Sequence, residues 1–226
     1  MDIGGRGNDN NSRENVFLEE DIKFKDPFAL FEEWFTLVKN DPRTFEPNAM
    51  CLSTVNKDGY PSARFVLLKG YNNDGFRFFT HYTSRKGQEM AENPNVALTF
   101  YWEHFRRSVR IEGVAERLPF SEADNYFKTR PYQSQIGALV SDQSKPIESR
   151  DVMTEKKKTL MEKYKGEAPR PPLWGGYNVR PHTIEFWQSQ TDKLHDRIRF
   201  QLKEKNLDDK YVNEGENGWV YQRLAP

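Results

Sequence analysis

Apolar residues occur along most of the chain in short runs, and this pattern predicts a protein built mainly from β-strands. The runs are rich in Val, Leu and Phe, and turn sequences such as Asn-Lys-Asp-Gly and Asn-Asn-Asp-Gly separate them. Half-buried strands joined by tight turns have this appearance. We expect strands at residues 49–55, 61–69, 76–80, 96–102, 108–118, 177–179, 183–188, 197–202 and 218–223.

Helical spacing appears between these groups of strands. After Asp26 and Pro27, apolar residues recur at steps of three and four, which predicts a capped helix that ends near residue 40. Ser84 and Ser121 are the expected caps of helices that run to about residues 92 and 129, and further helices are expected at 132–140 and 150–164. The fold class is therefore mainly β with helical insertions (α+β), an antiparallel barrel decorated with helices.

The two ends of the chain differ in character. Residues 1–20 are polar and are predicted to form a disordered arm, while residues 21–226 form a single domain. Gly175 and Gly176 lack the pattern of a nucleotide-binding loop, so we interpret them as a close approach between strands.

Composition excludes several classes of function. The chain has 34 basic and 34 acidic residues and a formal net charge of zero, which argues against a broad nucleic-acid surface. A single cysteine, Cys51, rules out a disulfide within the chain and fits a reducing, cytoplasmic location. No apolar run approaches the length of a membrane span, and four scattered histidines argue against a zinc site.

Cations at the ends of two neighbouring strands suggest an anion site. Arg64 and Lys69 lie five residues apart on one expected strand and should point to opposite faces. The next strand leads into Ser84, Arg85 and Lys86, where a hydroxyl, two cations and free helix N–H groups suit a phosphate. The alternative interpretation is a solvated basic turn.

A second possible phosphate site lies in the helical middle of the chain. Tyr126 and Arg130 are four residues apart and share a helix face, and Ser134 lies one turn further if the helix continues past Pro131. A phenol, a guanidinium and a hydroxyl together can hold a phosphate. The same spacing also fits an ordinary trio on a helix surface.

The segment 185–197 combines aromatic, amide and charged side chains. Trp187 is a candidate to cover a flat ring, His195 to orient a substrate or move a proton, and Arg197 to neutralise an anion. The alternatives are core packing for Trp187, a structural hydrogen bond for His195 and an ion pair with Asp196 for Arg197. No nucleophilic triad or metal-ligand spacing accompanies them, so a phosphorylated cofactor, a phosphorylated substrate or both are indicated.

Together these segments resemble the pyridoxamine/pyridoxine 5′-phosphate oxidase family. The resemblance covers nearly all of the chain beyond the polar arm. Its motifs occur in family order: Ser-Ala-Arg with Leu-Leu-Lys-Gly, Gly-Phe-Arg-Phe-Phe-Thr, Ser-Arg-Lys-Gly, Ser-Gln-Ile-Gly-Ala, Glu-Phe-Trp-Gln and Leu-His-Asp-Arg.

The resemblance implies an FMN-binding split β-barrel of antiparallel Greek-key type that works as a homodimer, with FMN at the subunit interface. The residues expected to bind FMN, some of them from the other subunit, are Arg64, Phe65, Val66, Leu67, Phe79, Thr80, Arg85, Lys86, Ser108, Gln143, Ser144, Trp187 and Arg197. The residues expected to bind substrate are Lys69, Tyr126, Arg130 and Ser134 at its phosphate, and Lys193, Leu194 and His195 at its pyridine ring.

The implied reaction oxidises pyridoxamine or pyridoxine 5′-phosphate to pyridoxal 5′-phosphate. Hydride passes from C4′ to flavin N5, and O2 then reoxidises the flavin and yields H2O2, with His195, Arg197 and Lys193 as the catalytic residues.

Two positions depart from the family pattern, because Lys193 replaces an Arg and Ser108 replaces a Gln. These departures leave open a relative that binds FMN or pyridoxal phosphate with weak or altered activity. A flavin reductase that uses a nicotinamide is a further alternative.

Overall fold

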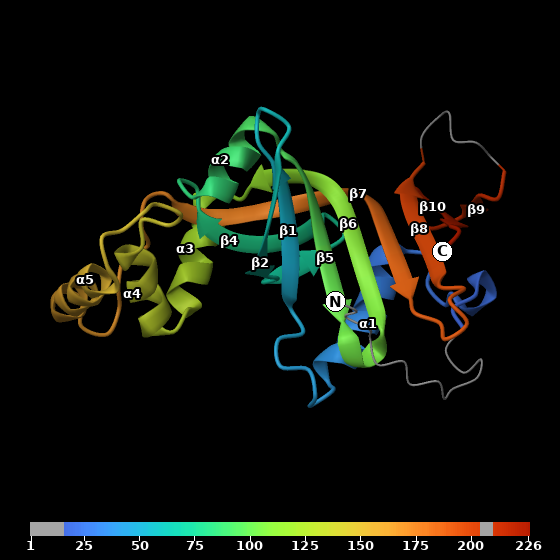
Figure 1. Ribbon diagram of the computed structural model, residues 1–226, viewed down its shortest axis with the longest axis horizontal. Helices are drawn as coiled ribbons and strands as arrows, with labels where there is room; N and C mark the ends of the chain where they lie inside the picture. Colours follow the sequence, from blue (N-terminus) through green and yellow to red (C-terminus); the bar gives the residue numbers. More distant parts are fainter. Residues whose placement is uncertain (1–15, 204–209) are drawn as a thin grey trace, which may run out of the picture. The chain divides into compact units, whose positions relative to one another are not determined.

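The structure is a computed structural model that describes residues 16–203 and 210–226 (Figure 1). Its helices are η1 (Glu19–Asp21), α1 (Pro27–Lys39), α2 (Arg85–Glu92), η2 (Glu103–Phe105), α3 (Phe120–Thr129), α4 (Tyr132–Val140) and α5 (Arg150–Lys163). Its strands are β1 (Ala49–Val55), β2 (Pro61–Leu67), β3 (Gly70–Asn72), β4 (Gly75–His81), β5 (Asn95–Trp102), β6 (Arg107–Arg117), β7 (Trp174–Gln188), β8 (Asp196–Leu202), β9 (Asn213–Glu214) and β10 (Trp219–Arg223). The prediction of a mainly β fold with inserted helices is confirmed.

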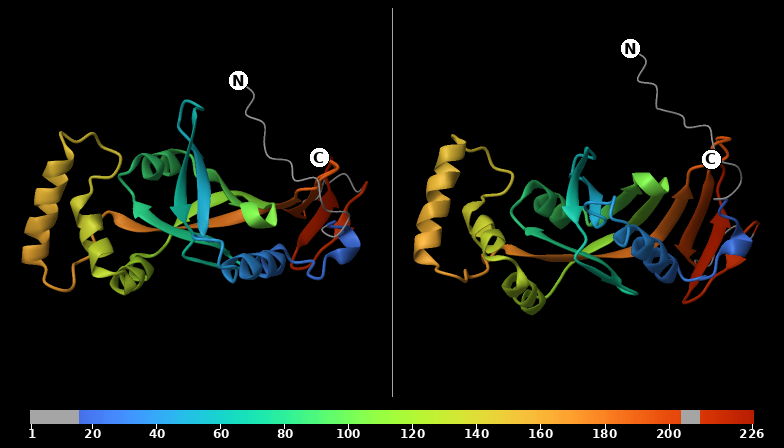
Figure 2. Two further views of the ribbon diagram at one scale, coloured as in Figure 1. Left: turned by 60° about the horizontal axis from the view of Figure 1, so that its bottom comes forward. Right: turned by 90° about the horizontal axis from the view of Figure 1, so that it is seen from below.

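The chain forms two compact units, to both of which the long strands β5, β6 and β7 contribute. One unit comprises residues 48–98 and 112–181. Its strands are hydrogen-bonded in the order β2-β1-β5-β6-β7-β4-β3, and the pairs β1–β2, β3–β4 and β4–β7 are antiparallel. Helix α2 contacts β1, and α4 and α5 lie side by side (Figures 1 and 2).

The other unit comprises the described residues up to 47 together with 99–111 and 182–226. Here β8 pairs with β7 and β10, and β10 also pairs with β9. Helix α1 packs its apolar face on the sheet of this unit, where Trp34 meets Phe186 of β7 edge-on at 5.2 Å and Phe31 lies 5.3 Å from Phe100 of β5. Burying such aromatic side chains supplies most of the stability of a core.

Local signals in the sequence account for two of the helix starts and fail at a third. Asp26 caps α1 by accepting hydrogen bonds from the backbone of Phe28 and Ala29, and Ser84 caps α2 by accepting from Gly87, as predicted. The prediction for Ser121 was wrong because α3 begins at Phe120 with Pro119 at the cap position and no side-chain cap bond.

The strands also differ from the prediction at one place. Residues 177–179 and 183–188 belong to one continuous strand, β7, and not to two. Pro181 suggests a break because it has no N–H to donate. The strand nevertheless continues beside its partner β6, which comes very close here: a Cβ added at Gly113 would lie 2.2 Å from the carbonyl oxygen of Arg180. Gly175 and Gly176 are likewise close approaches, to Tyr82 and Phe79.

The N-terminal segment makes defined contacts from residue 16 onward. Phe17 is buried, and its N–H donates to the carboxylate of Asp196 at 3.0 Å. Glu19 pairs with Arg223 at 2.7 Å. Residues 1–15 of the predicted disordered arm lie outside the described residues. The single domain expected at residues 21–226 stays a prediction. Within the described part of the chain, no helix has the length and apolar character to cross a bilayer.

Candidate functional site

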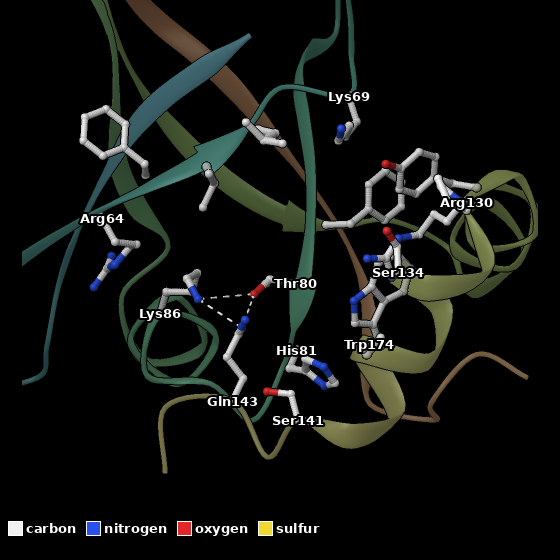
Figure 3. A pocket seen from close by; sticks show the side chains of 18 of the residues that line it. Arg64, Lys69, Thr80, His81, Lys86, Arg130, Ser134, Ser141, Gln143 and Trp174 are labelled. Carbon is white, nitrogen blue, oxygen red and sulfur yellow. Dashed lines mark hydrogen bonds between the residues drawn. The ribbon is translucent and has the colours of Figure 1, made fainter. Parts of the chain in front are cut away.

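A cavity of about 760 Å³ lies in the unit formed by residues 48–98 and 112–181 (Figure 3). Four cationic side chains line it, and none of the described lining residues is acidic. Cavities of this volume suit small organic ligands. The lining residues are Arg64, Phe65, Val66, Leu67, Lys69, Phe79, Thr80, His81, Lys86, Tyr126, Thr129, Arg130, Pro131, Ser134, Gly137, Ala138, Ser141, Gln143 and Trp174.

Lys86 is the most deeply buried of these cations. Its Nζ donates to Gln143 Oε1 at 3.1 Å and to Thr80 Oγ1 at 3.4 Å, and Thr80 Oγ1 donates to the same Gln143 oxygen at 2.8 Å (Figure 3). Burial, followed by the nearby charge of Arg64, lowers the pKa of Lys86 to about 8, although Glu89 opposes this. Because the buried ammonium group has lost most of its contact with water, an anionic ligand beside it would stabilise its charge.

Arg64 is held on β2 by partners on three elements. Its terminal nitrogens donate to the hydroxyls of Thr54 and Ser62, to the Leu52 carbonyl and to the Glu89 carboxylate. We expected Arg64 and Lys69 to point to opposite faces, yet both line the cavity. Residues 65–67 line it as well, so a place in the lining does not distinguish the two faces, and β2 ends at Leu67, so the alternation of a strand does not extend to Lys69.

An aromatic stack forms one wall of the cavity. Phe79 stacks on Tyr126 at 4.1 Å and on Trp174 at 5.4 Å. The guanidinium of Arg130 lies 4.7 Å above the Trp174 ring, and its Nη1 atom is buried with no hydrogen-bond partner among the described residues. Burial lowers the pKa of Arg130, and it raises the pKa of Tyr126. A buried donor without an acceptor is costly, so this atom marks a place for one.

Tyr126, Arg130 and Ser134 all line the cavity, although they do not lie on one helix. Helix α3 ends at Thr129, Arg130 has an extended backbone, and α4 starts at Tyr132. The break at Arg130-Pro131 thus brings the three side chains together by a turn and not by helical spacing.

Two predicted residues of this unit lie outside the cavity lining. Arg85 is largely exposed and donates through Nε to Glu89 at 2.8 Å. Ser144 is exposed, with φ of 74° in the left-handed region.

The lining residues that the sequence interpretation did not assign to the site include His81, Ser141 and Trp174. Burial and the charges of Lys86 and Arg130 lower the pKa of His81. Two of these residues stand close to predicted site residues in the sequence, which is the only signal that points to them: His81 follows Thr80, and Ser141 comes shortly before Gln143.

The remaining predicted residues belong to the other unit. Trp187 and His195 face each other with ring centres 5.1 Å apart, and His195 Nδ1 accepts a hydrogen bond from the Gln190 backbone at 3.0 Å. This bond leaves the proton of the neutral imidazole on Nε2. Lys193 and Leu194 are exposed, and Lys193 has a positive φ of 67°.

Arg197 is fixed by a buried carboxylate. Its Nε donates to Glu185 at 2.8 Å, and Arg110 donates to the other oxygen of Glu185 at 2.7 Å. Burial by itself would raise the pKa of Glu185, but these bonds outweigh it and hold the pKa below its usual value. The alternative pairing of Arg197 with Asp196 is not found, because Asp196 binds Arg223 at 2.7 Å.

Ser108 uses its hydroxyl within the protein. Its Oγ donates to the Phe100 carbonyl at 2.9 Å, between neighbouring strands β6 and β5. The side chain is therefore tied to the sheet, and it is shorter than the amide that the family pattern has at this position.

Solved structures with the same arrangement define the class of protein. PhzG from Burkholderia lata 383, in complex with tetrahydrophenazine-1-carboxylic acid, aligns with a TM-score of 0.82 and 29% identity, over 94% of this chain and 98% of that chain. A pyridoxamine 5′-phosphate oxidase-related, FMN-binding protein from Nostoc punctiforme aligns with a TM-score of 0.67 at 13% identity, over 89% of this chain and 98% of that chain, and shares the fold. The protein is thus a split β-barrel, as predicted.

Sequence comparison gives the family. The model of pyridoxamine 5′-phosphate oxidase matches residues 39–161, and that of the pyridoxine 5′-phosphate oxidase C-terminal dimerisation region matches residues 174–226. The chain belongs to the pyridoxamine 5′-phosphate oxidase family.

Curated relatives match over nearly the whole chain. The pyridoxine/pyridoxamine 5′-phosphate oxidase of Bombyx mori is 49% identical over 100% of this chain and 90% of its own length. The pyridoxine-5′-phosphate oxidase of Bos taurus is 46% identical over 100% and 88%. The Leptospira biflexa oxidase is 47% identical over 94% of both chains.

Proposed function

We propose that the protein oxidises pyridoxine 5′-phosphate or pyridoxamine 5′-phosphate to pyridoxal 5′-phosphate, with FMN as cofactor and O2 as electron acceptor. One observation carries the proposal beyond family membership: the four cations of the cavity face no acidic lining residue, and Arg130 Nη1 has no partner among the described residues. Cofactor and substrate each carry a phosphate of about −1.5 to −2 charges. Four cations are a fitting complement to two such groups.

The residues of the cavity divide into two groups around these phosphates. Lys69, Tyr126, Arg130 and Ser134 bind the phosphate ester of the substrate, as the orphaned donor of Arg130 supports. The residues near Lys86 bind FMN: the backbone and side chains of 64–67, together with Phe79, Thr80 and Gln143. Fixed donors cost no reorganisation when the ligand arrives, so they hold it in one orientation.

The residues of the other unit complete the site in a homodimer with FMN at the subunit interface. The matched dimerisation region supports this assembly. Trp187 and Arg197 contact FMN, and the rigid pairing of Arg197 with Glu185 fixes its guanidinium. His195 presents Nε2–H to the substrate, next to Lys193 and Leu194 at the pyridine ring. FMN, when bound, supplies the acceptor for the hydride of C4′ and passes the electrons to O2.

A steady-state assay tests the proposed function. The purified protein, supplied with FMN, is incubated with pyridoxine 5′-phosphate in air, and pyridoxal 5′-phosphate and H2O2 are measured together. We expect the two products in equal amounts. A yellow protein that forms neither product would instead support the alternative of a flavin-binding relative with little activity, which Lys193 and the tied hydroxyl of Ser108 favour. Reduction of the flavin by a nicotinamide alone would support a reductase.

A further inference from the structure

Glu89 is a buried acidic residue to which the proposed function gives no role. It lies on α2 and is only 4% exposed. Its carboxylate accepts hydrogen bonds from Thr54 on β1 at 2.5 Å, from Arg64 on β2 at 3.1 Å and from Arg85 on α2 at 2.8 Å. One side chain thus joins a helix and two strands at the edge of the cation-lined cavity.

The charge state of Glu89 follows from these contacts. Burial by itself raises the pKa of a carboxyl group, but the bonds from Thr54, Arg85 and Arg64 outweigh burial and hold the pKa of Glu89 below its usual value. Glu89 is therefore ionised at neutral pH. A buried carboxylate between two guanidinium groups is held in place, because its charge would be costly to leave unpaired.

The contact with Arg85 leaves most of that guanidinium available. Only Nε donates to Glu89, and the described residues offer no hydrogen-bond partner to the two terminal nitrogens. In Arg64 the two terminal nitrogens donate hydrogen bonds within the protein, and only Nε remains available to a ligand. Glu89 therefore binds one edge of the Arg85 guanidinium, and the two terminal nitrogens of this largely exposed side chain remain available to bind a phosphate through two bonds.

We propose that Glu89 is a positioning residue for the phosphate of the cofactor, which acts by orienting Arg85 and anchoring Arg64. This inference rests on the proposed function, since it takes FMN as the ligand. Arg64, Arg85 and Lys86 carry three positive charges and Glu89 one negative charge, which leaves two positive charges for a phosphate of about −1.5 to −2. The group is thus matched to a dianion.

Removal of the Glu89 charge has two opposing consequences. The local positive field becomes stronger, which favours a phosphate. Against this, Arg85 loses its fixed partner and Arg64 loses its only ionic one. Lys86 also loses a charge that supports its protonated form in a site where burial and Arg64 disfavour it. Orientation dominates, because both arginines contact the buried carboxylate directly, at 3.1 Å and 2.8 Å, whereas the added field acts over a greater distance.

The test compares FMN with riboflavin, which has the same ring system without the phosphate. Dissociation constants of both flavins are measured by fluorescence for the wild-type protein, Glu89→Gln and Glu89→Ala, with Glu92→Gln as the matched control, an exposed carboxylate on the same helix. We expect both Glu89 variants to bind FMN about tenfold to a hundredfold more weakly, the size of a lost charge-assisted bond. Riboflavin binding and the control should stay unchanged.

A double variant separates positioning from a general structural role. If Glu89 acts through Arg85, then Glu89→Gln combined with Arg85→Gln weakens FMN binding by less than the product of the two single effects. An equal loss of FMN and riboflavin affinity would make Glu89 merely structural and overturn the inference. Unchanged or tighter FMN binding in both Glu89 variants would overturn it as well. If the wild type itself does not prefer FMN to riboflavin, the proposed function fails together with this inference.

Discussion

Replacement of Arg130 by Gln should separate recognition of the substrate phosphate from every other role of the cavity. The guanidinium lies over the Trp174 ring, and its Nη1 atom has no hydrogen-bond partner among the described residues. In the proposed complex this nitrogen donates to the phosphate ester. A charge-assisted hydrogen bond contributes about 1.5–3 kcal/mol, which corresponds to a loss of about 10- to 150-fold in kcat/KM.

The same substitution should leave the free energy of unfolding nearly unchanged. The contact with Trp174 contributes about 0.5–1 kcal/mol, but removal of a desolvated cation without an acceptor relieves a penalty of similar size. Function and stability should therefore respond differently, which is unusual for a half-buried residue. Thermal unfolding of the variant measures this directly.

The assay compares two substrates that differ only in the phosphate. Steady-state kcat/KM is measured with pyridoxine 5′-phosphate and with pyridoxine, for the wild type and for Arg130→Gln. The matched control is Arg117→Gln, because Arg117 also lies over an aromatic ring, Tyr82, at 4.3 Å, but does not line the cavity. We expect the loss only for Arg130→Gln and only with the phosphorylated substrate. An equal fractional loss with both substrates would refute the reasoning.

Three further predictions concern the proposed cofactor and substrate sites. Affinity for FMN should fall as the pH rises through about 8, because Lys86 has its pKa lowered to about 8 in the free protein and loses its charge above that value; a titration of FMN binding from pH 6 to 10 that stays flat would contradict this. Lys193→Arg should stabilise the transition state by about 1–3 kcal/mol and so raise kcat/KM about 5- to 150-fold, because Arg restores a planar fork. The melting temperature should not change, since the side chain is exposed; equal or lower kcat/KM in steady-state assays would count against the prediction. Ser108→Gln should lower the dissociation constant of FMN, because the longer amide reaches beyond the Phe100 carbonyl that now holds the hydroxyl; a fluorescence titration with no change would show that this position does not face the flavin.

Much of the fold could be predicted because local chemistry decides it. Asp26 and Pro27 determine the start of α1 through capping and a fixed φ angle, whatever packs against the helix. The Ser121 cap and the broken strand around Pro181 were wrong for the opposite reason. At Pro181 the neighbouring strand β6 outweighs the local preference, and at Ser121 the helix already starts one residue earlier, after Pro119.

The candidate site was predictable in part for a similar reason. Lys86 and Thr80 stand beside recognisable motifs, and the structure joins them through Gln143, 57 residues beyond Lys86 in the chain. Trp174 has no such marker, because only the tertiary fold brings it to the cavity. The pairing of Arg197 with Glu185 and not with Asp196 follows from the register of β7 with β8, which no local pattern in the sequence reveals.

Anaerobic titration of the FMN-loaded protein tests the central claim most directly, namely that the cation-lined cavity presents a phosphorylated vitamin to the flavin. Pyridoxine 5′-phosphate is added without oxygen while the visible absorbance of the flavin is recorded. The account predicts stoichiometric bleaching, which recovers when air is admitted, and little bleaching by pyridoxine at the same concentration. Absorbance that stays unchanged with the phosphorylated substrate, or bleaches equally with both compounds, would contradict the account.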